Sequence, residues 1–427
     1  MNSAIEPLPA PTETTAPRVG VALMAAMVVL TCGHVLSNLL RTTPAVAIDV
    51  MAVDLHSTAQ KLAALTAAYH FSFAMCQIPI GVALDRYSIR NVSLVLFAGT
   101  LVGACMAALS QGSASFLLAQ IIMGMATSGM LLCPMALAAK RLTPAQFGLW
   151  SGLILSLGNG GLLLSSAPLA FVVEHWGWRS GFWLSGVAAC AVALLVLLIV
   201  PNDKPPASTR RALLTEMTTV LRLGVSPALR GIVILAFVSL AVQIVLRGLW
   251  AGPWLMNLKA LSRIEAGNVL LLFTIALVLA PTLSGVVDRR LGHRRLLLLG
   301  SQLLAAALFV AMALGGPGQP LSVLFGVAIM PVPFDIGVLV LIGFLICVQP
   351  LIYAMTRQVV PAEHVGKALS AVNLSFFLGT AVMQSATSPI AAAFGLPAVL
   401  IAMAAMLATG AVAFYILTSP AKSRVSA

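Results

Sequence analysis

Long apolar runs, separated by short charged or Pro/Gly-rich joints, dominate this 427-residue chain. An apolar helix crosses the hydrocarbon core of a bilayer in about 20 residues, so each run is long enough to span a membrane. Dividing the chain at its joints predicts twelve spans, at residues 20–47, 59–83, 91–111, 114–139, 146–172, 180–200, 230–256, 264–284, 294–314, 335–358, 366–391 and 396–418. The pattern therefore predicts an all-α polytopic membrane protein embedded in a lipid bilayer.

The longest polar segment between the spans, residues 202–229, divides them into two groups of six. The predicted organisation is a disordered cytoplasmic tail at 1–19, a six-helix half at 20–201, a cytoplasmic linker at 202–229, a second six-helix half at 230–418 and a cytoplasmic tail at 419–427. Residues 315–334 are too short and too rich in Gly and Pro for another full span. We interpret them as an enlarged outer loop that can dip into the membrane.

A charged motif occurs once in each half, between its second and third spans. The first copy, GVALDRYSIR at 81–90, contains Asp85, Arg86 and Arg90; the second, GVVDRRLGHRR at 285–295, contains Asp288, Arg289 and Arg294. In both, a carboxylate ends one helix and a basic cluster opens the next, so ion pairs can form at the membrane surface. The two aspartates lie 203 residues apart (288 − 85), which indicates two related halves. We predict that these six residues gate the cytoplasmic ends of the halves.

Composition and charge agree with this interpretation. With 60% hydrophobic and 8% charged residues, the chain cannot be a soluble protein of this length. The net charge of +12 does not indicate nucleic-acid binding, because the Lys and Arg residues lie at the ends of spans. Eighteen of the 24 Lys and Arg residues fall on the side of the N-terminal tail and four on the other side. This positive-inside bias predicts an inner (plasma) membrane protein with both termini in the cytoplasm.

The charged motif resembles the loop between helices two and three of the major facilitator superfamily. The family pattern is Gly, three residues, Asp-Arg, one residue, Gly and then basic residues. The second copy keeps the later glycine, Gly292, but its first glycine is one residue closer to Asp288. The first copy has Ser88 in place of the later glycine and Ile89 in place of a basic residue, so we expect a less tightly latched turn. The resemblance implies two pseudo-symmetric six-helix halves and secondary transport.

Two arginines lie within apolar sequence, Arg41 in the first span and Arg247 in the seventh, 206 residues apart (247 − 41). A basic side chain at the centre of a spanning helix costs roughly 2.5–3.5 kcal/mol, so retaining two suggests a water-filled cavity and an anionic ligand. Of the twelve Asp and Glu residues, only Asp49 and Asp335 could approach the lumen, both near the outer face. The alternative is that Arg41 lies at the outer interface and extends its side chain to the headgroups.

The segments around both arginines, LRTTPAVA at 40–47 and VLRGLW at 245–250, resemble the first and seventh helices of sugar-phosphate and organic-anion permeases. Members of that branch clamp an anion between arginines on these two helices, and a guanidinium offers bidentate donors to carboxylate or phosphate. Further predicted substrate-binding residues are His34, Asn38, Gln243, Trp250, Gln349, Tyr353 and Asn373. About half of the polar residues within spans are expected to form helix-to-helix hydrogen bonds instead.

We therefore predict a monomeric secondary active transporter that moves a small organic or phosphorylated anion by alternating access, without a cofactor or metal ion. No nucleophile–base pair, metal-ligand cluster or phosphate-binding loop indicates an enzyme. The residues leave the coupling open between a proton and a counter-substrate, by symport or antiport. One alternative is an exporter of lipophilic compounds, which Met123, Met125, Met130 and Met135 in the fourth span would suit, although methionines there are more often packing residues. Another is a transporter-like receptor that binds without moving substrate.

Overall fold

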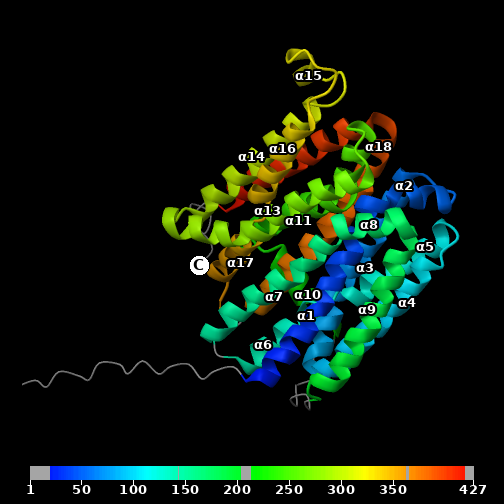
Figure 1. The fold of residues 1–427 in the computed structure, drawn as a ribbon. Helices are drawn as coiled ribbons and strands as arrows, with labels where there is room; N and C mark the ends of the chain where they lie inside the picture. Colours follow the sequence, from blue (N-terminus) through cyan, green and yellow to red (C-terminus); the bar gives the residue numbers. More distant parts are fainter. Residues whose placement is uncertain (1–19, 143, 203–212, 362–364, 419–427) are drawn as a thin grey trace, which may run out of the picture.

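The protein is described by a computed structural model that covers residues 20–142, 144–202, 213–361 and 365–418 (Figure 1). The predicted tails, 1–19 and 419–427, lie outside these residues. The N-terminal half consists of α1 (Val21–Thr42), α2 (Pro44–Asp54), α3 (Ala59–Arg86), α4 (Ile89–Ala108), α5 (Ser113–Thr127), α6 (Leu132–Arg141), α7 (Pro144–Leu164), α8 (Ala167–Trp176) and α9 (Trp178–Ile199).

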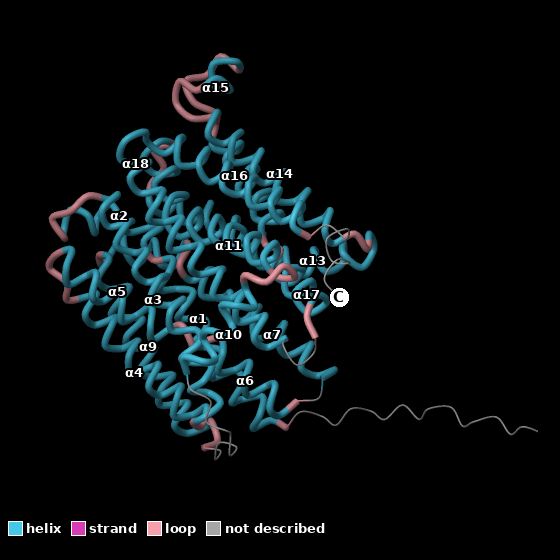
Figure 2. Tube along the Cα trace, turned by 180° about the vertical axis from the view of Figure 1, so that it is seen from behind, coloured by secondary structure: helices cyan, strands magenta, loops and turns pink. Residues whose placement is uncertain are grey.

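A short helix within the linker, α10 (Leu213–Gly224), precedes the C-terminal half. That half contains α11 (Arg230–Val245), the π-helical segment η1 (Leu246–Trp250), α12 (Ala251–Pro253), the π-helical segment η2 (Trp254–Leu258), α13 (Arg263–Leu291), α14 (Arg294–Leu314), α15 (Pro320–Leu324), α16 (Val332–Ile346), α17 (Gln349–Val359) and α18 (Val365–Leu417). Figures 1 and 2 show the two helical halves side by side. We call the end where α9 ends and α11 begins the linker face, and the end with α2 and α8 the opposite face.

Eleven helical segments of the described chain are long and apolar enough to cross a membrane. The last of them, 366–417, has 52 residues. At 1.5 Å per residue it would extend about 78 Å, more than twice the hydrocarbon core of a bilayer. Gly395 interrupts it with a non-helical conformation, φ 76°, which separates two spans. The all-helical fold with two groups of six spans is thus confirmed.

Several predicted spans are broken helices. The first ends at Thr42 because Pro44 starts a new helix, α2, which carries the chain beyond residue 47. The predicted spans 114–139, 146–172 and 335–358 are each divided into two helices, α5 and α6, α7 and α8, and α16 and α17. A proline lies in the first turn of α8 and of α17, where it needs no hydrogen-bond donor but prevents continuation of the preceding helix.

The segment 315–334 projects beyond the ends of α14 and α16, with α15 at its tip (Figures 1 and 2). It does not fold back between the helices. Its side chains Val323, Leu324 and Phe325 are 66%, 79% and 64% exposed. The expected enlarged loop is therefore present, as a protrusion of the C-terminal half.

Close packing of α1 on α7 depends on two glycines. A Cβ atom at Gly158 would lie 1.9 Å from a ring carbon of His34, and one at Gly161 would lie 2.0 Å from the Val35 carbonyl oxygen. Small residues let spanning helices approach in this way. The approach places the polar face of α1, with His34 and Arg41, toward the centre of the molecule.

Candidate functional site

A cavity of about 410 Å³ lies between the two halves. This volume is within the range of small-molecule sites, about 300–1,000 Å³. Seven of the nine predicted substrate-binding residues line it, namely His34, Arg41, Gln243, Arg247, Gln349, Tyr353 and Asn373. Among the residues that the structure describes, no Asp or Glu belongs to the lining. The cavity therefore carries the positive charge of two arginines without a carboxylate to oppose it.

Arg247 connects the two halves at the end of the cavity nearest the opposite face. Its side chain is 1% exposed. Nε donates to the Thr274 hydroxyl at 2.8 Å, within the C-terminal half. Nη2 donates across to the N-terminal half, to the Leu162 carbonyl at 2.9 Å and to the hydroxyls of Ser165 and Ser166 at 3.3 and 2.6 Å. The other terminal nitrogen, Nη1, is buried and has no hydrogen-bond partner among the described residues.

The local backbone explains why Arg247 reaches the other half. It lies in η1, where an extra residue per turn displaces the helix, and such π-bulges recur at functional sites. The next residue, Gly248, faces α1: a Cβ atom there would lie 3.4 Å from the Arg41 carbonyl oxygen and from a methyl carbon of Thr42. The end of α1 and η1 are thus in contact, and the two arginines enter the same cavity.

Arg41 has a different environment from Arg247. It is half-buried, and its Nε has no hydrogen-bond partner among the residues that the structure describes. Its guanidinium carbon lies 5.7 Å from the centre of the Phe377 ring, a cation–π distance. Arg41 therefore offers unpaired donors to the cavity beside an aromatic surface.

Four polar residues of the C-terminal half line the cavity in two pairs. Gln349 Nε2 donates to Gln243 Oε1 at 2.8 Å, and the Tyr353 hydroxyl donates to Asn373 Oδ1 at 2.6 Å. These pairs join α17 to α11 and to α18. They stabilise one wall of the cavity, and part of their hydrogen-bonding capacity is already used.

Asn38 and Trp250 lie outside the lining, contrary to our expectation for substrate-binding residues. Asn38 is fully buried between α1 and α7 and donates to the Gly158 carbonyl at 2.9 Å. The Trp250 indole donates to the Thr387 hydroxyl of α18 at 3.0 Å. Helical spacing alone assigned them to the cavity, but both side chains face a neighbouring helix and form the helix-to-helix bonds expected of part of the polar set.

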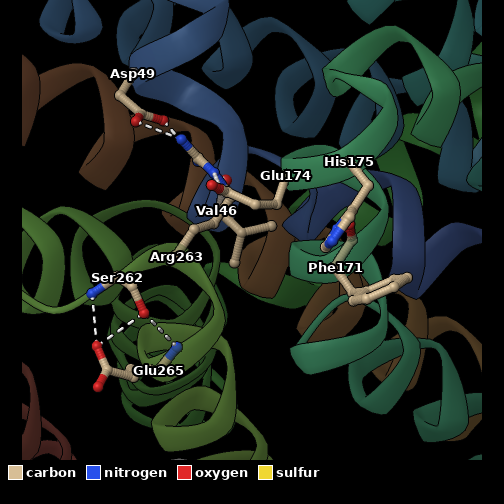
Figure 3. A network of polar contacts seen from close by, with 8 residues as sticks. All are labelled: Val46, Asp49, Phe171, Glu174, His175, Ser262, Arg263 and Glu265. Atoms are coloured by element: carbon tan, nitrogen blue, oxygen red, sulfur yellow. Dashed lines mark hydrogen bonds and ion pairs between the residues drawn. The ribbon is translucent and has the colours of Figure 1, made fainter.

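A second contact between the halves, at the opposite face, centres on Arg263 (Figure 3). Arg263 begins α13 and makes a bidentate pair with Asp49 of α2, at 2.9 and 2.8 Å. Its Nε donates to Glu174 of α8 at 3.0 Å, and Nη1 donates to the Val46 carbonyl. We call these four residues the Arg263 latch. Because one partner belongs to the C-terminal half and three to the N-terminal half, the latch holds the halves together beyond the end of the cavity.

The start of α13 fixes the position of the latch. Ser262 and Glu265 form a capping box, in which each side chain bonds the backbone amide of the other residue, so Arg263 follows an ordered helix start (Figure 3). Asp49 lies in α2, beyond the span of α1. Burial would raise the pKa of its carboxyl, but hydrogen bonds from Arg263 and the charge of that side chain outweigh burial and lower the pKa below its ordinary value.

The sequence did not predict the partners of Arg263. Charged residues at outer joints were its only signal. Nor did it predict the contact between His70 of α3 and Gln384 of α18, whose Nδ1 and Oε1 atoms lie 2.9 Å apart across the two halves. Asp335, which could have approached the lumen, pairs instead with Lys259 at 2.8 Å and accepts a hydrogen bond from Trp254. Asp49 and Asp335, the two carboxylates that the sequence placed nearest the lumen, thus pair with basic residues outside the cavity lining.

The charged motifs at the linker face differ between the halves. In the second copy, Arg294 Nε donates to both Asp288 oxygens, at 2.9 and 2.7 Å, and Gly292 ends α13 in the left-handed conformation, φ 65°. This pair lies within the C-terminal half, between α13 and α14. In the first copy, Ser88 replaces the glycine and caps α4 by accepting from the Asn91 amide at 3.2 Å.

The other predicted gating residues are less fully described. The side chains of Asp85 and Arg289 lie outside the described part of the structure. Arg86 and Arg90 are half-buried at the end of α3 and the start of α4.

Comparison with known proteins identifies the family. The model of a family described as the Major Facilitator Superfamily matches residues 30–332 and 232–427. A tetracenomycin C resistance and export protein from Streptomyces glaucescens is 28% identical over 178 residues, 39% of this chain and 32% of that protein. The uncharacterized transporter YybO from Bacillus subtilis (strain 168) is 22% identical over 180 residues, 42% of this chain and 41% of that protein. The matches thus span about a third to two fifths of these relatives' own lengths.

Solved transporter structures share the fold at low sequence identity. A POT family transporter in complex with 5-aminolevulinic acid has a TM-score of 0.77 and 13% identity, covering 95% of this chain and 99% of that one. The nucleoside transporter NupG has a TM-score of 0.72 and 12% identity, covering 93% of this chain and 100% of that one. At this identity the likeness concerns the fold alone.

Proposed function

The chain belongs to the Major Facilitator Superfamily, and from this premise we propose that it is a secondary active transporter of small organic or phosphorylated anions. The observation that carries the proposal is the pairing of Arg41 and Arg247, one from each half, in one cavity without a lining Asp or Glu among the described residues. A buried guanidinium without a counter-charge is costly, and an anion entering the cavity supplies that charge.

The free donors support the same proposal. Arg41 Nε and Arg247 Nη1 are both buried and unpartnered among the residues that the structure describes. Planar guanidiniums bind carboxylate and phosphate oxygens through directed, charge-assisted hydrogen bonds. An anion between the two side chains would satisfy donors from both halves at once. Binding would therefore be linked to the relative position of the halves.

The contacts between the halves suggest how access alternates. Arg247 and the Arg263 latch form two successive layers that close the opposite face. From Arg41 and Arg247 the lining continues toward the linker face, along α7 to Gly152 and along α13 to Pro281. On the positive-inside bias we assign the linker face to the cytoplasm, so this conformation closes the outside. Opening outward would require both layers to separate.

The test uses purified protein in detergent and a thermal-shift assay against monocarboxylates, sugar phosphates and lipophilic cations, each at millimolar concentration. A ligand that binds the folded state raises the melting temperature by mass action. We expect stabilisation by anions, loss of that stabilisation in Arg41→Gln, and retention in Arg230→Gln, which removes an equal charge at an exposed position. An anion that stabilises the parent is then tested for uptake into proteoliposomes. Stabilisation by cations alone would overturn the proposal, and binding without uptake would indicate a receptor.

A second candidate, an exporter of lipophilic compounds, is favoured by one relative, which is described as a tetracenomycin C resistance and export protein. The apolar side chains of the lining suit such a substrate as well. The same assay distinguishes the two functions, because a neutral lipophilic substrate would bind equally well to the parent and to Arg41→Gln.

A further inference from the structure

We infer that the substrate is an amphipathic organic anion, with its charge at one end and an apolar, ring-bearing body, and not a polyhydroxylated phosphate. The inference rests on the proposed anion transport and names the substrate class of that site. It depends on the apolar side chains of the cavity lining. We call six of them the apolar wall: Leu155, Leu240, Ile244, Leu277, Phe376 and Phe377.

The apolar wall comes from both halves. Leu155 belongs to α7 of the N-terminal half, and the other five residues belong to α11, α13 and α18 of the C-terminal half. A ligand that fills the cavity therefore touches apolar surface on both sides of its body. Burying apolar surface is favourable in proportion to area, whereas a body covered with hydroxyls would lose its hydrogen bonds to water against such a wall.

Four polar residues of the lining already bond to one another and replace those lost bonds only in part. Gln349 is paired with Gln243, and Tyr353 with Asn373, at 2.8 and 2.6 Å. A substrate hydroxyl near these pairs would have to displace or share one of the bonds, which leaves mainly Ser156 and Asn159 of α7 for its hydrogen bonds. An unpaired buried hydroxyl weakens binding by roughly tenfold or more. A sugar phosphate carries several hydroxyls, more than Ser156 and Asn159 can pair, so the cavity discriminates against it.

The position of Phe377 links the charged end of the cavity to the apolar wall. Arg41 lies 5.7 Å above its ring, and the ring itself packs on Phe73 of α3, with 4.1 Å between ring centres. The ring is thus held between the two halves, next to the free guanidinium. An anionic group bound at Arg41 places the adjoining part of the ligand against Phe377. An aromatic or alicyclic body next to the charge fits this arrangement.

The experiment compares three probes on the purified full chain by isothermal titration calorimetry. The probes are 2-naphthoate, an aromatic carboxylate; 2-naphthamide, its neutral isostere; and glucose 6-phosphate, a hydroxylated anion. We expect the Kd of 2-naphthoate to be at least tenfold lower than that of either other probe. Equal binding of the naphthoate and the naphthamide would overturn the proposed anion function. Tighter binding of glucose 6-phosphate would overturn this inference and leave anion transport standing.

Variants of Phe377 test whether its ring contributes to the binding of 2-naphthoate. Phe377→Leu keeps apolar volume but removes the ring, and we expect it to raise the Kd of 2-naphthoate about tenfold. Phe377→Ala should raise it further, if that variant folds. Phe171→Ala is the matched control, because this ring is 47% exposed on α8 and does not line the cavity. An unchanged Kd in Phe377→Leu, or no naphthoate binding to the parent at millimolar concentration, would overturn the inference.

Discussion

Arg41 and Arg247 occupy corresponding places in the two halves, at the end of the first helix of each, yet their surroundings differ. Arg247 is 1% exposed and donates to four acceptors, three of them in the other half. Arg41 is half-buried, with an unpartnered Nε and an aromatic ring for a neighbour. The comparison suggests different roles for the two arginines: Arg247 holds the halves together, and the donors of Arg41 remain free for the ligand.

The two roles differ because the two guanidiniums have different numbers of neutral acceptors around them. Hydroxyl and carbonyl oxygens satisfy the donors of Arg247 but leave its charge uncompensated, so an anion still gains by approaching it. At Arg41 neither the donors nor the charge has a partner among the described residues. Removing either arginine should therefore weaken anion binding severely, while only the removal of Arg247 should also destabilise the empty protein.

The largest effect is expected for Arg247→Gln. The change leaves the hydroxyls of Thr274 and Ser166 and the Leu162 carbonyl without their charged donor, and it removes half of the positive charge of the cavity. We expect transport of a confirmed anion to fall at least a hundredfold and the melting temperature to drop by several degrees. Arg247→Lys should keep the charge but lose the planar fork, with an intermediate loss. A transport rate close to that of the parent would contradict the role of Arg247.

Arg41→Gln tests whether Arg41 serves anion binding without stabilising the empty protein. We expect transport to fall at least thirtyfold, in step with a rise of the Kd for the anion of at least thirtyfold. The melting temperature of the empty protein should stay the same or rise, because an uncompensated buried charge has been removed. Uptake and thermal unfolding of the same preparation check both parts. A loss of stability as large as that of Arg247→Gln would mean that the two arginines are equivalent.

The Arg263 latch tests whether Arg247 closes the opposite face alone. Its partners Asp49 and Glu174 are 41% and 50% exposed, and pairs of this kind contribute about 0.2–1 kcal/mol each. Arg263→Gln removes both pairs and should therefore raise the outward-open population by about twofold to thirtyfold. Spin labels on exposed Gln111 and Asn257, one on each half, would report the distance across this face after the native cysteines are replaced. An unchanged distance distribution would assign closure to Arg247.

A smaller effect is expected at the linker face, where the halves differ again. Asp288 is 7% exposed and bonded to Arg294, within one half. Asp288→Asn should lower the free energy of unfolding by about 1–2 kcal/mol, as for a largely buried charge-assisted bond. It should shift the balance of inward- and outward-open forms less than Arg263→Gln. Urea unfolding measures the loss of stability, and the same spin-label pair measures the balance of the two forms. A larger shift of that balance in Asp288→Asn than in Arg263→Gln would mean that Asp288 holds the two halves together.

The smallest effect is expected from pH. Since the folded pKa of Asp49 is lowered, its pairing contributes fully above the ordinary carboxyl pKa of about 3.9 and is lost only as pH falls through the lowered value. The spin-label distance across the opposite face should therefore be the same at pH 5 and pH 8. Asp49→Asn should give the more open distribution at both. A change between these pH values would mean that another group couples a proton to opening.

Much of the fold could be predicted because the bilayer sets the length of each span, and the charged joints mark the ends. The predicted fourth, fifth and tenth spans have the right extent, although prolines and short turns divide them. The pairing of Arg41 with Arg247 also followed from the repeat, because their spacing of 206 residues is close to the 203 residues between Asp85 and Asp288. Asn38 and Trp250 were misplaced because spacing on one helix does not say whether a side chain faces the lumen or a neighbouring helix.

The sequence by itself therefore determined what depends on local hydrophobicity and on repetition: the spans, the two halves and the two arginines of the cavity. Only the tertiary structure decided which groups meet across the halves. Arg263 and Asp49 are 214 residues apart in the chain, and His70 and Gln384 are 314 apart. No local pattern specifies such partners, because they depend on how the two halves pack. The asymmetry between Arg41 and Arg247 arises in the same way, from acceptors on α7 and the segment before α8 that approach only one of them.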